Sequence, residues 1–141
     1  MHTDDAKIRE ILENTRVIAL VGASMNPARP SYGVMRFLIG QGKRVIPVNP
    51  GHAGQSLHGE TVYATLKDIP TDAAVDMVDV FRNSDAVLPI VEQALADLPH
   101  LRTIWLQLGV ESAAGAALAA AHDVDWVQNR CPKIEYARLG L

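Results

Sequence analysis

The residues from Gly22 to Gly33 carry the clearest chemical signal in this sequence. They read GASMNPARPSYG, which combines small residues, hydroxyl side chains and one arginine directly before the start of a predicted helix. The N–H groups and the dipole at a helix start attract phosphate. Gly22, Ala23 and Ser24 would let the backbone approach a pyrophosphate, and Arg29 can form paired hydrogen bonds with phosphate oxygens. A plain strand-to-helix turn usually has about two to six residues, so this length favours a binding loop.

The same loop lacks the motifs of two common nucleotide sites. The dinucleotide motif needs glycine at three spaced positions, but Ser24 and Pro27 stand at the second and third. An NAD site also has an acidic residue at the end of the second strand, where this chain has Asn49-Pro50. The P-loop pattern GxxxxGK[ST] is absent from the sequence. The loop therefore predicts a phosphate-bearing ligand other than NAD, without hydrolysis of the P-loop type.

No catalytic or metal-binding arrangement can be identified in the sequence. Histidines occur at positions 2, 52, 58, 100 and 122, without the usual spacing of metal ligands, and no Ser-His-Asp set or carboxylate pair is evident. The single cysteine, Cys131, cannot form an internal disulfide. The nearby Arg130 and Lys133 would favour its reactive thiolate form, but a small buried residue is an equally good interpretation.

Alternating strand and helix patterns predict the fold that positions these residues. Short apolar runs at 17–21, 45–48, 75–80, 104–108 and 124–127 predict strands, and helical periodicity occurs between them. The continuous run Val17–Val21 is typical of a parallel strand covered on both faces. We expect an α/β fold, a single Rossmann-like domain over residues 1–141 with a doubly wound parallel sheet in the order 3-2-1-4-5. The ligand would lie at the carboxyl ends of the strands, and Ser31 would cap the helix after the loop.

Composition restricts the partners and the compartment. The 141 residues contain 13 Lys+Arg and 16 Asp+Glu, a net charge of −3, with 5% aromatic residues. This balance argues against a nucleic-acid binder and against a polybasic membrane-surface protein. No apolar stretch reaches the roughly 18–20 residues that span a bilayer, and one unpaired cysteine suits a reducing compartment. We therefore expect a cytoplasmic protein that binds neither nucleic acid nor membrane.

Five segments together resemble the small bacterial CoA-binding proteins. They are GASMNPARPSYGV at 22–34, VIPVNP at 45–50, VDVFR at 78–82, WLQLGV at 105–110 and RCPKIEYARL at 130–139. That family has a single Rossmann-like domain, similar to the N-terminal CoA-binding domain of the succinyl-CoA synthetase α subunit. The resemblance covers nearly the whole chain. One departure is Asn129, because an acidic residue usually precedes the arginine at this place.

The resemblance implies a site for coenzyme A or an acyl-CoA, with the following residues as contacts. The pyrophosphate would be taken by Gly22, Ala23, Ser24, Arg29, Pro30, Ser31, Tyr32 and Gly33, with Lys43 as a further basic contact. The adenosine would be flanked by Val48, Asn49 and Pro50, and the crevice would be lined by Phe81, Arg82, Gln107 and Gly109. The residues alone leave other roles open: Asn49 can form a turn, and Arg82 can pair with Asp79 or Asp85.

The expected function is that of a CoA-binding module without catalysis of its own, acting as a carrier, a sensor or a partner-dependent component of acyl-CoA metabolism. A homo-oligomer or a protein partner stays open, as does a mixed disulfide between CoA and Cys131. The alternative is a nucleotide-dependent enzyme, either an oxidoreductase or a ligase component, that uses the same site. An interaction protein without a ligand is the third hypothesis.

Overall fold

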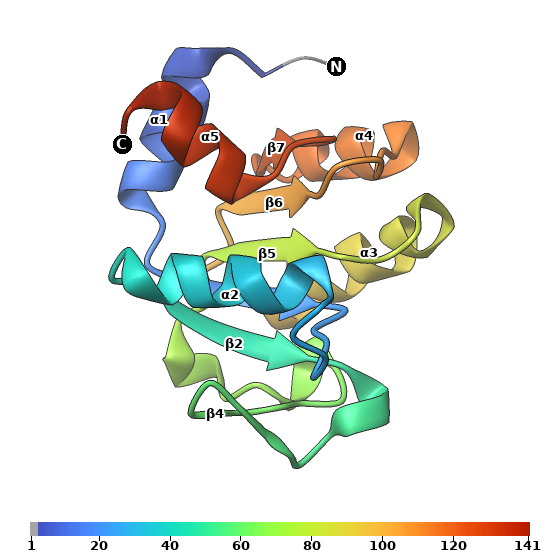
Figure 1. Cartoon of the computed structure of the whole chain (residues 1–141). Helices are drawn as coiled ribbons and strands as arrows, with labels where there is room; N and C mark the ends of the chain where they lie inside the picture. Colours follow the sequence, from blue (N-terminus) through green and yellow to red (C-terminus); the bar gives the residue numbers. More distant parts are fainter. Residues whose placement is uncertain (1–2) are drawn as a thin grey trace.

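A parallel sheet lies between two layers of helices in the computed structural model of the chain, which describes residues 3–141 (Figure 1). His2, one of the histidines considered above, lies outside these residues. The main helices are α1 (Asp5–Asn14), α2 (Pro30–Gly40), α3 (Val87–Asp97), α4 (Ala113–Ala121) and α5 (Pro132–Leu139). The strands of the sheet are β1 (Val17–Val21), β2 (Arg44–Val48), β5 (Met77–Val80), β6 (Thr103–Leu106) and β7 (Asp125–Val127).

The order of the strands is β2-β1-β5-β6-β7, and all pairs are parallel. The fold class is the expected Rossmann-like α/β class, but the expected order 3-2-1-4-5 is wrong, because the third main strand, β5, pairs with β1 and not with β2. The Asp76 carboxylate explains this pairing, since it accepts hydrogen bonds from the N–H groups of Arg16 (3.0 Å) and Val17 (3.1 Å) and thereby holds the start of β5 beside β1. The point where the order reverses therefore lies between the ends of β1 and β5.

The connection from β2 to β5 contains no long helix. It consists of the 3₁₀ turns η1 (Pro50–His52), η2 (Leu66–Asp68) and η3 (Thr71–Ala73) and a small antiparallel pair, β3 (Ser56–Leu57) with β4 (Glu60–Thr61). The strands predicted from the sequence did not include this pair. The Arg44 guanidinium donates two hydrogen bonds to the Glu60 carboxylate (2.9 and 3.2 Å), which ties this pair to the outer strand β2. The segment thus covers an edge that would otherwise be open to pairing.

Each face of the sheet has its own apolar core. Ala19 and Val21 pack in the cluster that includes residues of α3 and α4, whereas Ile18 and Leu20 pack in the cluster that includes residues of α1, α2 and α5. This alternation follows from the two-residue period of a strand. In Figure 1 the drawn arrows of β2, β5 and β6 point to the right, so the carboxyl edge of the sheet lies on that side.

The C-terminal helix α5 is fixed to the sheet by a buried carboxylate. Glu135 is 3% exposed and accepts hydrogen bonds from Arg130 (3.0 Å) and Arg138 (2.8 Å). The Tyr136 hydroxyl donates to the carbonyl oxygen of Leu12 in α1 (3.3 Å). These contacts hold the first turn of α5, including Lys133, at the carboxyl edge of the sheet.

Candidate functional site

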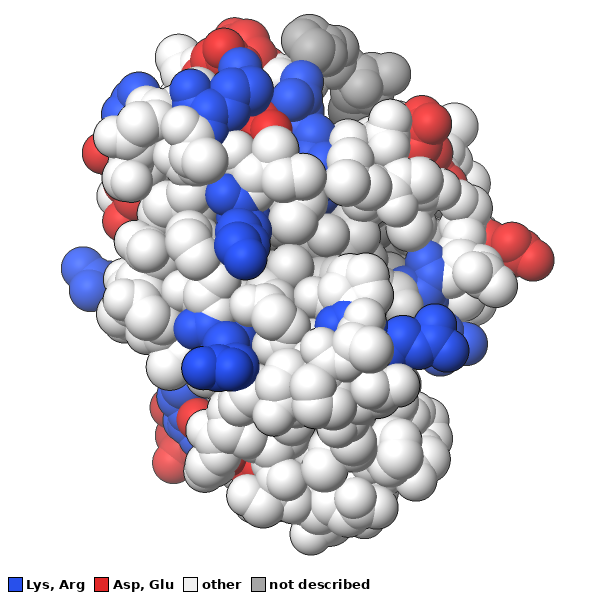
Figure 2. Space-filling model, in the orientation of Figure 1, with Lys and Arg blue, Asp and Glu red and all other residues white. Residues whose placement is uncertain are grey.

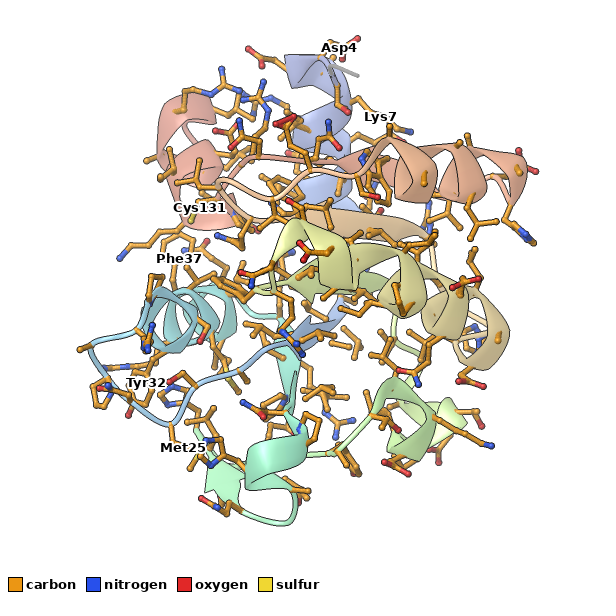
Figure 3. The ribbon with its side chains drawn as sticks, turned by 90° about the vertical axis from the view of Figure 1, so that its right-hand side faces the viewer. Asp4, Lys7, Met25, Tyr32, Phe37 and Cys131 are labelled. Atoms are coloured by element: carbon orange, nitrogen blue, oxygen red, sulfur yellow. The ribbon has the colours of Figure 1, made fainter. Side chains whose placement is uncertain are left out.

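Two hollows open at the carboxyl edge of the sheet and share Phe81 and Arg82 as a common wall. The smaller has a volume of about 520 Å³ and the larger of about 1030 Å³. Small-molecule sites commonly measure about 300–1,000 Å³. Figure 3 looks onto this edge, with Cys131 at the start of α5 and with Met25 and Tyr32 on the side of the loop after β1. The wall shared by the two hollows lies where the strand order reverses, between β1 and β5.

Most of the residues expected in the site line one of these hollows. In the smaller are Gly22, Val48, Asn49, Pro50, Phe81 and Arg82, and in the larger are Arg29, Pro30, Gly33, Phe81, Arg82 and Gln107. Ala23, Ser24, Ser31 and Tyr32 belong to the loop and helix start that run beside the hollows. Gly109 lies between Leu108 and Val110, both of which line the larger hollow.

Gly22 lets the end of β1 approach the end of β5. Its φ angle is +88°, a backbone conformation that residues with a side chain rarely adopt. A Cβ atom at this position would lie 2.5 Å from the carbonyl oxygen of Phe81. The sequence interpretation assigned Gly22 to contact with phosphate. In the structure, the position requires glycine for another reason: only a residue without a Cβ atom allows the ends of β1 and β5 to come this close.

The N–H groups of the loop after β1 are already used by the protein. Gly22 and Ala23 donate to the carbonyl oxygen of Val48 (2.9 and 3.3 Å), and the Ser24 N–H donates to Ser31 Oγ (3.0 Å). These bonds fix the shape of the loop and leave the three N–H groups unavailable to a ligand. The Ser24 hydroxyl accepts from the Asn26 N–H (3.0 Å) and can still donate its own proton.

The start of α2 is not capped by a side chain. The expected cap at Ser31 is wrong: the helix begins at Pro30, Arg29 occupies the capping position, and no side chain of residues 3–141 caps the first N–H groups. Ser31 Oγ instead accepts from the N–H of Ser24. An uncapped helix start keeps its partial positive charge available to an anion.

Arg29 and Arg82 add two positive charges at the hollows. Both are exposed, and neither forms an ion pair among residues 3–141. Within residues 3–141, Arg82 forms an ion pair with neither Asp79 nor Asp85, the two partners that the sequence left open. Asp79 is completely buried. Figure 2 has the orientation of Figure 1, so this edge lies on its right-hand side, where both basic and acidic side chains are visible. Arg29 and Arg82 thus bring positive charge to the hollows although the chain carries a net charge of −3.

The side chain of Asn49 connects the two loops that border the smaller hollow. Its amide nitrogen donates to the carbonyl oxygen of Ala23 (2.7 Å), and its oxygen accepts from the N–H of Gly51 (2.9 Å). Sequence reasoning missed the opposite wall, which consists of Ala64, Thr65, Leu66, Ile90 and Gln93. No local motif marks these residues, because they come from two separate segments, the connection from β2 to β5 and helix α3, which only the folded chain brings together.

The larger hollow combines a buried polar floor with residues of α5. Gln107 is 6% exposed, and its Oε1 atom has no hydrogen-bond partner among residues 3–141. Cys131 is 7% exposed and precedes α5 directly. Its neighbour Arg130 is paired with Glu135, whereas Lys133 lies 5.9 Å from the centre of the Phe37 ring. Sequence reasoning left out Lys133, Ile134 and Ala137 as lining residues, although all three belong to the 130–139 segment.

Asn129 shows why an acidic residue can be absent from its position. Its φ angle is +56°, which asparagine tolerates better than most residues, and its Oδ1 atom accepts a hydrogen bond from the N–H of Gly109 (2.7 Å). A carboxylate would offer the same kind of acceptor. The departure from the family pattern therefore preserves the contact that supports the turn after β6.

Lys43 lies at the opposite edge of the sheet. It precedes β2, and its Nζ atom donates to the carbonyl oxygen of Thr15 (2.7 Å). Burial lowers the pKa of the Lys43 ammonium, partly offset by the nearby Asp76 carboxylate. The beginning and the end of a parallel strand lie at opposite edges, so the structure does not bring Lys43 to the hollows.

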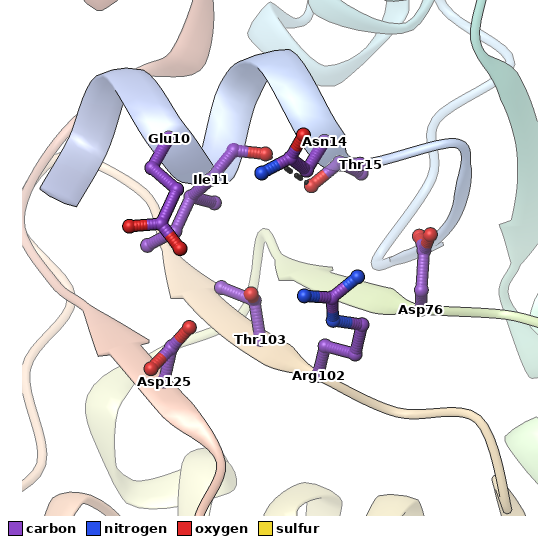
Figure 4. Close-up of a pocket in the computed structure, with 8 residues that line it drawn as sticks. All are labelled: Glu10, Ile11, Asn14, Thr15, Asp76, Arg102, Thr103 and Asp125. Carbon is purple, nitrogen blue, oxygen red and sulfur yellow. Dashed lines mark hydrogen bonds between the residues drawn. The ribbon is translucent and has the colours of Figure 1, made fainter.

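A third pocket, shown in Figure 4, lies at this amino-terminal edge. Its volume is about 20 Å³, which is room for a single water molecule. Two of the polar groups around it have partners: the Thr15 hydroxyl donates to the carbonyl oxygen of Ile11 (2.7 Å), and Asp125 pairs with Lys7 (3.3 Å). This pocket is too small for a nucleotide.

Residues 3–141 contain neither a cluster of metal ligands nor a helix that could span a membrane. Within residues 3–141, no group of three or more His, Cys, Asp or Glu side chains is arranged to hold a metal ion. In the same residues, every helix is too short or too polar to cross a membrane.

Comparison with known proteins finds relatives along almost the entire chain. Residues 16–137 match the model of a family described as CoA binding domain. The chain is similar to the uncharacterized protein YneT of Bacillus subtilis, with 32% identity over 133 residues, which are 94% of this chain and 93% of YneT. It is also similar to a solved Thermus thermophilus protein, cell-free ID.343, with 34% identity and a TM-score of 0.88, covering 97% of this chain and 99% of that one.

A more distant solved structure is a dinucleotide-forming acetyl-coenzyme A synthetase 1 of Ca. Korarchaeum cryptofilum, in complex with phosphate and ADP. The identity is 22% and the TM-score is 0.68, and the match covers 85% of this chain but only 27% of the synthetase chain. At this identity the likeness shows a shared fold.

Proposed function

Because this chain belongs to the CoA binding domain family, we propose that it binds coenzyme A across the two hollows at the carboxyl edge of its sheet. The observation that carries the assignment of the site is the position of Arg29 and Arg82, which form no ion pair within residues 3–141, on the walls of adjoining hollows beside the start of α2. CoA is a long molecule with anionic phosphates near one end, so it requires cations beside an extended groove.

Each part of CoA has a matching part of the site. The adenosine would occupy the smaller hollow, against Val48, Asn49 and Pro50. The phosphates would lie at the start of α2, contacted by Arg29 and Arg82 and by the Ser24 hydroxyl. The pantetheine arm would run through the larger hollow past Gln107 toward Cys131.

The proposed role is binding, with any chemistry left to a partner. The chain would act in the cytoplasm as a carrier, a sensor or a component of acyl-CoA metabolism, and residues 1–141 would form one domain. The competing function is that of an enzyme that uses a different nucleotide at the same site.

Calorimetry of one protein sample with CoA, acetyl-CoA, NAD⁺ and ATP separates these functions. We expect binding of the CoA compounds and none of comparable strength for NAD⁺ or ATP. Absence of CoA binding at millimolar ligand would overturn the proposal, and tight binding of NAD⁺ would favour an oxidoreductase.

We expect Arg29→Ala and Arg82→Ala each to weaken CoA binding by about 10- to 100-fold, the usual effect of losing a hydrogen bond to a charged group. Thermal unfolding should be unchanged, because both side chains are exposed and unpaired in residues 3–141. The matched control is Arg36→Ala, an exposed arginine of α2 that does not line either hollow. Equal affinities for the three variants would remove both arginines from the site.

We expect Cys131 to react with CoA disulfide. The Cys131 thiolate would attack one sulfur of CoA disulfide, form a Cys131–S–S–CoA bond and release one CoA thiolate, so that the added disulfide acts as the oxidant. Intact-protein mass spectrometry should show one CoA adduct, lost with dithiothreitol and absent from Cys131→Ser. An unmodified wild-type protein would leave Cys131 as a buried wall residue only.

A further inference from the structure

The larger hollow has a cationic part and an apolar part. Its cations are Arg29, Arg82 and Lys133, from the loop after β1, the end of β5 and the start of α5. The remaining wall is mostly apolar and includes Val34, Leu108, Val110, Ile134 and Ala137. Free CoA ends in a thiol, which does not require such an apolar surface.

Two residues of this apolar part are unusually exposed. Leu108 is 58% exposed and Ile134 is 50% exposed, and they are two of the four large hydrophobic residues exposed in the described chain. They come from different elements, the loop after β6 and helix α5, yet both line the same hollow. Covering an exposed side chain of this kind stabilises a complex, because apolar surface is removed from water.

The buried floor of the hollow connects its two parts. Gln107 directly precedes Leu108, and its unpartnered Oε1 atom is an acceptor for an N–H group of a ligand. Cys131 lies in the same hollow, three residues before Ile134. A CoA molecule with its phosphates at Arg29 and Arg82 would bring its amide groups to Gln107 and its sulfur toward Leu108 and Ile134.

We propose, on the basis of the CoA site described above, that the ligand is a CoA thioester with an apolar acyl chain, and that this chain covers Leu108 and Ile134. Free CoA would leave both side chains in water. An acyl chain of several carbons would remove both side chains from water. Such a chain is uncharged and needs no charged partner, which suits a wall made of apolar side chains. A second protein copy is the other occupant that could cover this surface.

The test is calorimetry of the wild-type protein with free CoA and with its acetyl, butyryl, hexanoyl and octanoyl thioesters. We expect the affinity to rise by about two- to fourfold for each added CH₂ until the surface is covered. In the double variant Leu108→Ser/Ile134→Ser, the ratio of the octanoyl-CoA affinity to the CoA affinity should fall toward one. The matched control is Ile39→Ser, since Ile39 is 36% exposed on α2 and does not line the hollow.

The outcomes separate the acyl site from the CoA site. If CoA binds but all thioesters bind equally well, the acyl site is overturned and the CoA site stands. If neither CoA nor any thioester binds, the proposed function itself fails. If light scattering shows a wild-type dimer that the double variant loses, while the ratio does not change, the surface belongs to a protein interface and the acyl site is overturned.

Discussion

Replacing Gly22 by alanine is expected to lower the free energy of unfolding by about 2–5 kcal/mol and to abolish measurable CoA binding. The first contribution is backbone strain, because the φ of +88° costs a residue with a side chain about 1–2 kcal/mol. The second is overpacking: a Cβ atom 2.5 Å from the carbonyl oxygen of Phe81 forces the ends of β1 and β5 apart, which typically costs about 1–3 kcal/mol. Binding suffers because these two strand ends support the shared wall of both hollows.

Urea denaturation and calorimetry with CoA measure the two effects of Gly22→Ala. Gly40→Ala is the matched control, since a Cβ atom there meets nothing within 4 Å and the φ is ordinary for a helix residue. The control should be as stable as the wild-type protein or slightly more stable, because alanine favours helix more than glycine does. A Gly22→Ala protein with wild-type stability and affinity would contradict the structural role given to this residue.

The second large effect concerns Asp79, whose carboxyl group lies in the interior of the sheet. Asp79 is 0% exposed, and neither of its oxygens has a hydrogen-bond partner within the described chain. It lies in register with Leu20 of β1 and Trp105 of β6, both apolar and buried. Burial raises the pKa of the Asp79 carboxyl well above its usual range, because the charged form would lose its hydration. The folded protein therefore keeps Asp79 protonated to a higher pH than the unfolded chain does.

A raised pKa in the folded state makes stability fall as the pH rises. Below the ordinary pKa of aspartate, about 3.9, both states are protonated and the contribution of Asp79 is fully present. Between that value and the higher pKa of the folded state, the unfolded chain loses a proton that the folded chain retains. In this window the folding equilibrium constant decreases by about tenfold for each pH unit on account of Asp79.

Asp79→Asn is expected to remove this dependence, because asparagine has the same shape and does not titrate. The variant should gain stability relative to the wild-type protein as the pH is raised from 4 to 7, when urea midpoints are compared at each pH. Asp85→Asn, which alters an exposed carboxylate after β5, should show no such gain. Parallel pH profiles for the wild-type protein and Asp79→Asn would show that Asp79 is ionised in the fold.

Local features of the fold were predictable because they depend on nearby residues. The apolar run Val17–Val21 forms β1, and the amphipathic pattern after Pro30 forms α2. The loop between them borders both hollows, as the Gly22–Gly33 segment indicated. Cap positions were less predictable, since Ser31 was available both to cap α2 and to bind the N–H of Ser24, and only the folded loop selects the second.

The sequence by itself determined the α/β class, the two helical layers and the position of the Gly22–Gly33 loop, because side-chain period and loop composition are properties of short segments. Tertiary structure decided the strand order, since β5 pairs with β1 through the distant contact of Asp76 with Arg16 and Val17. That pairing brings Phe81 beside Gly22. Lys43 lies at the far edge because it precedes the parallel strand β2. Tertiary structure also decided that the N–H groups of Gly22, Ala23 and Ser24 are bonded within the protein. Their acceptors, the carbonyl oxygen of Val48 and the hydroxyl of Ser31, come from other segments of the chain.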